Sequence, residues 1–150
     1  MKPLAWKQGT FEISTDRQHL DVDTIHGFLS TSYWARGIPR GLVERSIRGS
    51  LCFGVYDGPA QVGFARVISD YATFAYLADV FVLESHRGRG LAKWLMACVK
   101  CHPDLQGLRR WSLATRDAHG LYRRFGFASP SDPSMSMEIV DRKAYGNHLI

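Results

Sequence analysis

Residues 76–92 read YLADVFVLESHRGRGLA, and the fold is decided in this stretch. Its first part, Tyr76–Leu83, is almost entirely apolar, which predicts a central strand covered on both faces of a sheet. From about Gly90 apolar residues recur at helical spacing, and they predict a helix that reaches His102 and is stopped by Pro103. A short turn rich in glycine and arginine therefore joins a buried strand to an amphipathic helix.

The turn Arg87-Gly88-Arg89-Gly90-Leu91-Ala92, called the phosphate turn below, has the properties of an anion site. A helix begins with free backbone N–H groups and the positive end of its dipole. Glycines let a phosphate approach those groups, and the two arginines can add charge-assisted hydrogen bonds. The spacing matches neither GxxxxGK[ST] nor GxGxxG, because Lys93 stands in place of the third glycine. We therefore predict a pyrophosphate-binding turn, with an ordinary surface turn as the alternative.

The phosphate turn resembles the signature of the GNAT superfamily of acetyltransferases, (Arg/Gln)-x-x-Gly-x-(Gly/Ala), which also lies between a strand and a helix. The resemblance implies that the preceding strand bulges and that its backbone hydrogen-bonds the pantetheine arm of acetyl-CoA, here around Phe81, Val82 and Leu83. It also implies that the pyrophosphate is held by the loop that contains Arg87, Gly88, Arg89, Gly90, Leu91 and Ala92.

A second motif lies downstream, at residues 115–127, which read TRDAHGLYRRFGF. The GNAT family often carries N-x-x-A-x-x-x-Y-x-x-x-G-F after its fifth strand, and here Thr115 replaces the asparagine. The matching residues are Ala118, Tyr122, Gly126 and Phe127. The resemblance implies that Tyr122 lies beside the CoA sulfur and protonates the leaving thiolate. A phenol suits that role because it stays protonated at neutral pH, although a core aromatic on a helix face is the alternative.

Direct acetyl transfer also needs a group that accepts the proton of the amine. Asp79 interrupts the apolar strand, and a buried carboxylate is costly without a partner or a task. It resembles the acidic residue at this place in polyamine acetyltransferases, so it could attract a cationic amine or relay a proton through water. A structural role, paired with an arginine or with backbone N–H groups, is the alternative.

The acceptor pocket of this family is usually walled by the region between the first two helices. Here that region contains Tyr33, Trp34 and Arg36. The two aromatic rings could stack on an apolar substrate and the arginine could hold a carboxylate. The aromatics could equally cover the core.

The remaining patterns predict strands over about 10–14, 51–56, 61–69, 110–115 and 135–140, and helices over about 21–29, 39–49 and 118–126. Their order is that of a mixed α/β (α+β) layer. With the resemblance, it predicts a GNAT-like acyl-CoA N-acyltransferase fold. We expect a mixed, mostly antiparallel sheet of six or seven strands, flanked by about four helices and splayed near Val82. Residues 1–150 are expected to form a single domain with a core at about 10–141.

Composition narrows the choice of partners and compartment. No apolar run is long enough for a transmembrane helix, and nothing after Met1 resembles a signal peptide. The three cysteines, an odd number, suggest reduced thiols in a cytoplasmic protein. Cys98 and Cys101 lack a second ligand pair, so we expect helix packing and no metal. The net charge of +5 suits a cofactor with several phosphates, and the scattered arginines make nucleic acid an unlikely partner.

The resemblance to the GNAT family implies an N-acetyltransferase that moves an acetyl group from acetyl-CoA to a primary amine, which we expect to belong to a small molecule. The amine would attack directly in a ternary complex, with Tyr122 as the general acid. The alternatives are acetylation of a protein N-terminus or lysine and a non-catalytic acyl-CoA-binding or sensing module. Dimerisation is common among the proteins that the chain resembles, so a homodimer is compatible with the resemblance.

Overall fold

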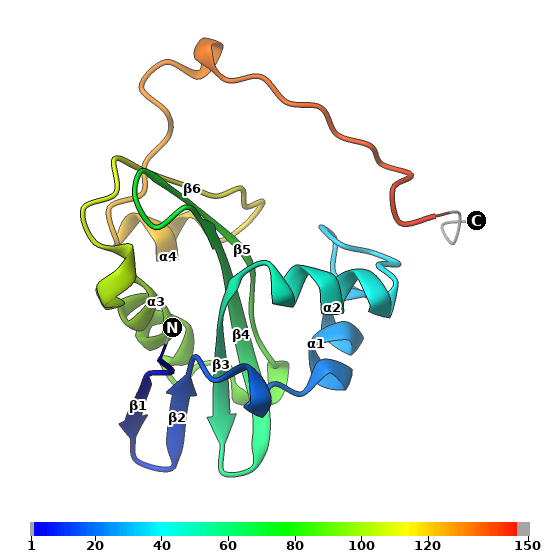
Figure 1. The fold of residues 1–150 in the computed structure, drawn as a ribbon, viewed down its shortest axis with the longest axis vertical. Coiled ribbons are helices and arrows are strands. Elements are labelled where there is room, and N and C mark those ends of the chain that lie inside the picture. Colours follow the sequence, from blue (N-terminus) through cyan, green and yellow to red (C-terminus); the bar gives the residue numbers. More distant parts are fainter. Residues whose placement is uncertain (1, 147–150) are drawn as a thin grey trace.

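The computed structural model describes residues 2–146 and is built on one six-stranded sheet (Figure 1). The strands are β1 (Ala5–Gln8), β2 (Phe11–Ser14), β3 (Leu51–Asp57), β4 (Ala60–Ser69), β5 (Phe74–Val82) and β6 (Arg110–Ser112). They lie side by side in sequence order, and every neighbouring pair is antiparallel except β5 and β6, which are parallel. The predicted fold class, a mixed and mostly antiparallel sheet with helices, is confirmed.

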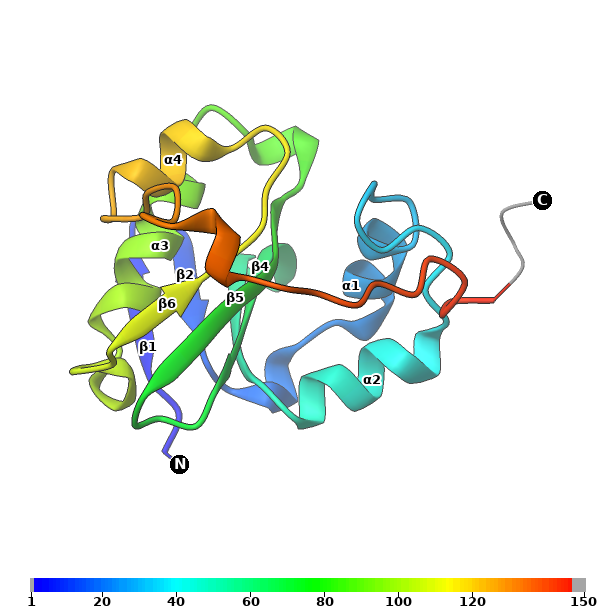
Figure 2. The same cartoon turned by 90° about the horizontal axis from the view of Figure 1, so that it is seen from above.

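Two pairs of helices cover opposite faces of the sheet (Figure 2). They are α1 (Val22–Leu29) and α2 (Arg40–Arg48) on one face, and α3 (Leu91–Cys101) and α4 (His119–Arg123) on the other. Helix α1 begins after Asp21, whose carboxylate accepts a hydrogen bond from the N–H of Thr24. Within residues 2–146 no helix is both long and apolar enough to cross a membrane.

The central hairpin of β3 and β4 is buried on both faces because both faces carry helices. Successive side chains of a strand point to opposite faces. Phe53 accordingly belongs to the cluster under α3, whereas its neighbour Cys52 belongs to the cluster under α1 and α2. The hairpin turns at Gly58, which has a positive φ of 58°. This doubly covered hairpin is the rigid support of the strand β5 beside it.

Strand β5 is paired on one side along most of its length and on the other side only at its start. It pairs with β6 over Phe74–Tyr76, and the last pair is Tyr76 with Ser112. Beyond that pair β5 continues to Val82 with β4 as its only strand partner in the described residues. We call the opening between β5 and the chain after β6 the slot. The splay was predicted near Val82, but it begins after Tyr76, which is six residues earlier in the chain. The middle of β5 is only half-buried, which corrects the expectation of a strand covered on both faces.

A bulge interrupts β5 within the slot. The register between β4 and β5 shifts between Phe64 and Arg66, opposite the stretch that contains Asp79. Asp79 has a φ of 57°, in the left-handed region that residues other than glycine seldom adopt. A bulge of this kind bends the strand and redirects its side chains.

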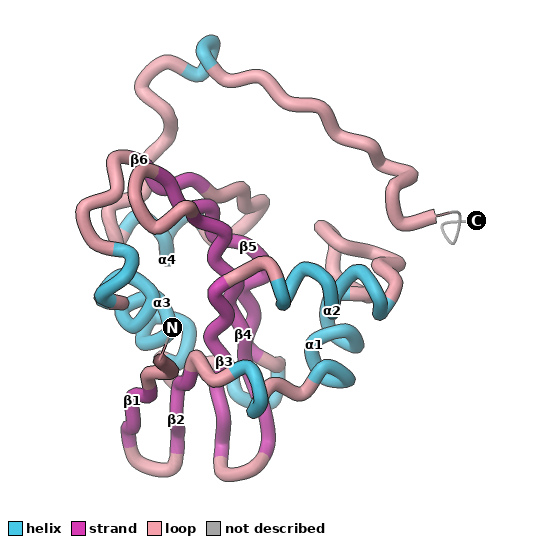
Figure 3. Tube along the Cα trace, viewed as in Figure 1, coloured by secondary structure: helices cyan, strands magenta, loops and turns pink. Residues whose placement is uncertain are grey.

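One strand expectation is confirmed and another is wrong. The strand expected at 10–14 forms as β2, the second half of a hairpin whose unexpected first strand, β1, pairs with it across Gly9. The strand expected at 135–140 does not form. After a 3-10 turn at Pro133–Met135 the chain runs extended and away from the sheet (Figure 3). Its alternating sequence has no neighbouring strand among residues 2–146 with which to share hydrogen bonds.

We predict that Phe53→Ala lowers the free energy of unfolding by about 3–5 kcal/mol. Phe53 is fully buried, stacks on Trp6 and meets the edge of His102, so truncation leaves a cavity between the sheet and α3. Urea denaturation followed by circular dichroism measures the change. Ile68→Thr, at an exposed position of β4, should change stability by less than about 0.5 kcal/mol, and equal losses in the two variants would contradict this account of the core.

Candidate functional site

The phosphate turn lies where β5 gives way to α3. Gly88 and Gly90 have φ of 80° and 76°, so the backbone conformation itself favours glycine at both positions. A side chain added at either would meet no atom within 4 Å, so the space above the turn is open. Gly90 directly precedes the first residue of α3, and the N–H groups of that first turn face the same opening.

A hollow of about 330 Å³ connects the turn to the end of β5. Its lining residues are Val82, His86, Arg87, Gly88, Gly90, Leu91, Ala92, Lys93 and Leu121. Six of the ten predicted cofactor residues therefore surround one space, together with Leu121 of α4. Sequence reasoning treated Lys93 only as the residue that replaces a third glycine, although its place in the first helical turn suits an anion.

Four predicted cofactor residues lie outside that lining. Phe81 is buried and stacks on Phe28 of α1 with ring centroids 4.1 Å apart. The N–H of Leu83 donates to the carbonyl of Val62 at 2.8 Å, so the sheet already uses it. Arg89 is exposed. The fourth, Tyr122, belongs to a second hollow.

Tyr122 lies on α4 with its ring buried against Phe127. Burial, with smaller contributions from the neighbouring Tyr33 and Asp117, raises the pKa of its phenol to about 12. The group is therefore protonated at neutral pH. Thr115, which replaces the asparagine of the motif, accepts a hydrogen bond from the N–H of Ala118 at 3.1 Å through its hydroxyl. Ala118 directly precedes the first residue of α4.

Tyr122 also lines a second hollow, of about 590 Å³, beside β6. The hollow is bounded by residues 110–115, His119, Tyr122, Arg123, 127–132, Met135 and Ser136. It thus lies between β6, α4 and the start of the C-terminal stretch. No sequence pattern indicated that this last stretch reaches the site.

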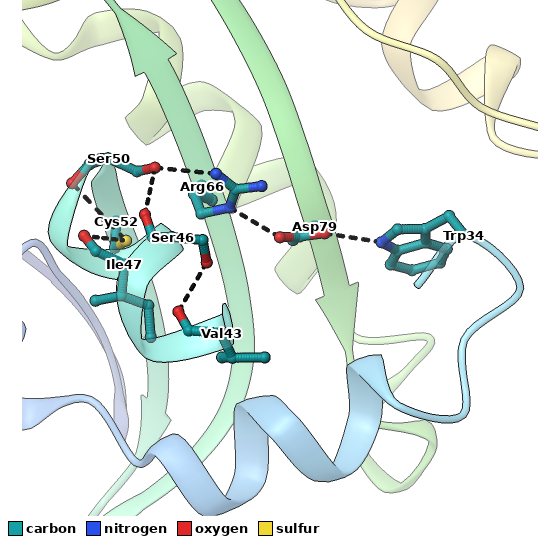
Figure 4. A network of polar contacts seen from close by, with 8 residues as sticks. All are labelled: Trp34, Val43, Ser46, Ile47, Ser50, Cys52, Arg66 and Asp79. Atoms are coloured by element: carbon teal, nitrogen blue, oxygen red, sulfur yellow. Dashed lines mark hydrogen bonds and ion pairs between the residues drawn. The ribbon is translucent and has the colours of Figure 1, made fainter. Parts of the chain in front are cut away.

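Asp79 lies between two donors that come from distant parts of the chain (Figure 4). Arg66 of β4 donates from Nε to one carboxylate oxygen at 2.8 Å, and Trp34 donates from its indole Nε1 to the other at 2.9 Å. Arg66 is fixed in turn by the Ser50 hydroxyl, which accepts from Nη1 at 3.0 Å. The sequence analysis gave pairing with an arginine as the structural alternative for Asp79, and this pairing is present.

The loop between α1 and α2 reaches across the slot to the loop that precedes α4. The Tyr33 hydroxyl accepts a hydrogen bond from the N–H of Arg116 at 2.9 Å, and the Arg116 guanidinium lies 4.0 Å from the centre of the Tyr33 ring. Trp34 packs edge-on against the same ring. Two predicted acceptor residues therefore meet at the slot, whereas Arg36 is exposed in the same loop. Arg116 occupies a variable position of the motif, so no sequence pattern pointed to it.

The cysteines and acidic residues do not gather into a metal site within residues 2–146, where no three His, Cys, Asp or Glu side chains lie together. Cys98 packs in the core under α3, and the Cys101 thiol donates to the Cys98 carbonyl at 3.4 Å. Of the CxxC pair, Cys98 thus belongs to the packing of that helix, whereas Cys101 is exposed.

Known proteins share both the sequence and the fold. A family model described as an acetyltransferase (GNAT) domain matches residues 48–129. A protein of Gibberella zeae named as an acetyltransferase is 35% identical over 144 residues, with 81% of this chain and 80% of the relative covered.

Among solved structures, a GNAT-family acetyltransferase from Xanthomonas campestris is 57% identical, with a TM-score of 0.89 and coverage of 91% of this chain and 97% of that one. A structure from Clostridium acetobutylicum, described as an acetyltransferase with acetyl-CoA, has a TM-score of 0.62 at 10% identity, covers 87% of this chain and 94% of its own, and supports the fold alone. The family model spans more than half of the chain, and it includes the slot, the phosphate turn and Tyr122. The chain therefore belongs to the GNAT family of acetyltransferases.

Proposed function

We propose that the protein is an acetyl-CoA-dependent N-acetyltransferase that acetylates a primary amine of a small molecule by direct attack. GNAT proteins generally use acyl-CoA as the donor. The observation that carries the proposal is the hollow at the phosphate turn, where two glycines with positive φ open onto the start of α3 beside the slot.

The residues of the phosphate turn fit the pyrophosphate of CoA. The open space above Gly88 and Gly90 admits a phosphate to the first N–H groups of α3. Arg89 is exposed beside that space, and Lys93 borders it. Arg87 donates from Nε to the carbonyl of Val82 at 3.0 Å, which joins the turn to the end of β5. Acetyl-CoA supplies the activated thioester when bound.

Tyr122 provides the proton for the departing sulfur. In the transfer, the amine nitrogen forms a bond to the acetyl carbon, the carbon–sulfur bond breaks, and the amine loses a proton. The phenol keeps its own proton at neutral pH, as any phenol does, and burial widens the margin by raising its pKa from 10.0 to about 12. A neutral hydroxyl can donate to negative charge that develops on sulfur, as a general acid does.

Asp79 serves the acceptor side of the slot in this proposal. Both of its oxygens accept hydrogen bonds, which supports a positioning role in which the carboxylate fixes the Trp34 indole. If Asp79 also has a catalytic role, it accepts the proton of the amine through a water molecule.

A small acceptor is favoured over a peptide by the contact between Tyr33 and Arg116. That contact joins the loops on the two sides of the slot. An extended peptide that crossed the slot would have to displace it, whereas a compact amine would not.

We also propose a cytoplasmic location. All three cysteines are free thiols, and two of them, Cys52 and Cys98, are buried. Free thiols are typical of a reducing compartment.

Arg87→Ala combined with Gly88→Asp should abolish binding of CoA, because the double change removes one cation and places a carboxylate where a phosphate would lie. Calorimetric titration with acetyl-CoA and CoA measures the affinity. The control is Gly58→Asp in the β3–β4 turn, where φ is also positive and a new side chain also meets open space. This control should bind normally, and retained affinity in the double variant would remove the phosphate assignment.

Tyr122→Phe should lower kcat by roughly 10²- to 10⁴-fold, the usual contribution of a general acid, while the affinity for CoA stays near that of the wild type. Release of the CoA thiol in the presence of a panel of amines measures turnover. Tyr71→Phe, the same change on an exposed loop residue, is the control. Undiminished turnover in Tyr122→Phe would sink the general-acid role.

The pH profile gives a second test of Tyr122. With a pKa of about 12 instead of the ordinary 10.0, the phenol loses its proton only in strongly alkaline solution. Activity that depends on this proton should therefore show no loss from phenol ionisation below about pH 11. A fall centred on pH 10 that disappears in Tyr122→Phe would contradict the raised pKa.

Arg66→Met should lower the free energy of unfolding by about 3–5 kcal/mol, because it leaves the Asp79 carboxylate without its cation in a site where the two side chains are only 16% and 10% exposed. Urea denaturation measures the loss. Adding Asp79→Asn should restore most of it, since asparagine tolerates the left-handed backbone and carries no charge. Arg40→Met is the matched control, because Arg40 and Asp23 are 48% and 82% exposed and their pair should contribute little.

A further inference from the structure

The Arg116 guanidinium is a cation at the slot that has no hydrogen-bond or ion-pair partner among residues 2–146. It lies 4.0 Å from the centre of the Tyr33 ring, while the backbone N–H of the same arginine donates to the Tyr33 hydroxyl at 2.9 Å. A cation–π contact uses the positive charge and leaves the outward N–H donors of the guanidinium available. A fixed, exposed arginine of this kind is ready to bind an anionic group.

This guanidinium belongs to the end of the slot where the acetyl group would be transferred. Arg116 directly follows Thr115, which lines the same 590 Å³ hollow as Tyr122. Tyr33, on which the guanidinium lies, is also within electrostatic reach of the Tyr122 phenol, since it contributes to the raised pKa of that group. A molecule held by the arginine would therefore extend toward the proposed general acid.

The other charges around the slot leave this cation without compensation. The Asp79 carboxylate is already occupied by Arg66 and by the Trp34 indole (Figure 4). Arg36 is exposed in the loop between α1 and α2 and forms no ion pair in the part of the chain that the structure describes. Asp117 is the one acidic residue in the loop before α4. Two unpaired arginines therefore face one unpaired aspartate, and the balance favours an acceptor with a negative charge.

We propose that the acceptor is an amine that also carries a carboxylate, as an amino acid does, and that Arg116 binds the carboxylate; the inference rests on the proposed transferase function. A guanidinium can direct two parallel N–H groups at the two oxygens of a carboxylate. A carboxylate suits the site better than a phosphate, because a single guanidinium beside Asp117 balances one negative charge and not two. The contact with Tyr33 persists in this arrangement, since it does not use the donors that bind the carboxylate.

Acceptors that differ only in the carboxylate test the proposal. Glycine, L-leucine, L-phenylalanine, β-alanine and 4-aminobutyrate are each compared with the matching primary amide, and release of the CoA thiol measures kcat/KM. At least one carboxylate should be preferred over its amide by about 10-fold or more, the usual contribution of hydrogen bonds to a charged group.

Arg116→Ala should remove this preference. It should lower kcat/KM for the carboxylate by roughly 10- to 100-fold and leave that for the amide within about threefold. Arg116→Lys keeps the charge without the paired donors and should retain only part of the preference. The control is Arg48→Ala, at an exposed position near the end of α2, and it should behave as the wild type. Equal losses for carboxylates and amides in Arg116→Ala, or a stronger preference for phosphoethanolamine in the wild type, would overturn the assignment.

A binding measurement separates this inference from the transferase proposal, because it needs no turnover. The purified chain, alone and loaded with CoA, is titrated calorimetrically with the same carboxylates and amides. Tighter binding of a carboxylate that is lost in Arg116→Ala supports the role of the arginine even where no amine is acetylated, a result that would refute only the transferase proposal. Acetylation of amides without any preference for a carboxylate would keep the transferase and refute the role of Arg116. Failure of every carboxylate to bind at millimolar concentration would refute it as well.

Discussion

The contacts of the Asp79 carboxylate hold the bulge on which the slot depends. A residue other than glycine at a φ of 57° carries backbone strain, and it persists only where its surroundings fix it. Arg66 holds the side chain from β4 and Trp34 holds it from the loop between α1 and α2. The change of register lies at this place, and β5 runs on to the phosphate turn beyond it. One carboxylate thus links β4 and β5 to the loop between α1 and α2.

Two separate clusters of buried side chains support the residues on the two sides of the slot. The cluster under α3 and α4 and the cluster under α1 and α2 lie on opposite faces of the sheet, and the β3–β4 hairpin separates them. The phosphate turn and Tyr122 belong to the first side, whereas Tyr33 and Trp34 belong to the second. The phosphate turn and the loop between α1 and α2 are therefore positioned by different cores, and Leu83 packs against both.

Local patterns in the sequence predicted the strand, turn and helix of residues 76–101 and the central hairpin, because periodicity and stop signals act over a few residues. The partners of Asp79 could not be predicted in the same way, since Arg66 and Trp34 lie 13 and 45 residues away. The alternating residues of 135–140 predicted a strand, but a strand also needs a neighbour, which the pattern does not specify. β1 was missed because it has no alternating apolar pattern. Of its four residues only Trp6 is half-buried, and the other three are exposed.

The contact between Tyr33 and Arg116 rests on one hydrogen bond and one cation–π interaction between exposed loops. Interactions of this kind are worth on the order of 1 kcal/mol each. A loop contact of that strength breaks and re-forms thermally within nanoseconds to microseconds, far faster than an ordinary catalytic cycle. The width of the opening between these two loops is therefore an average over rapid breaking and re-forming of the contact. Selection among molecules of different bulk that pass between the two loops then depends on how often the opening is wide enough, as well as on the shape of its walls.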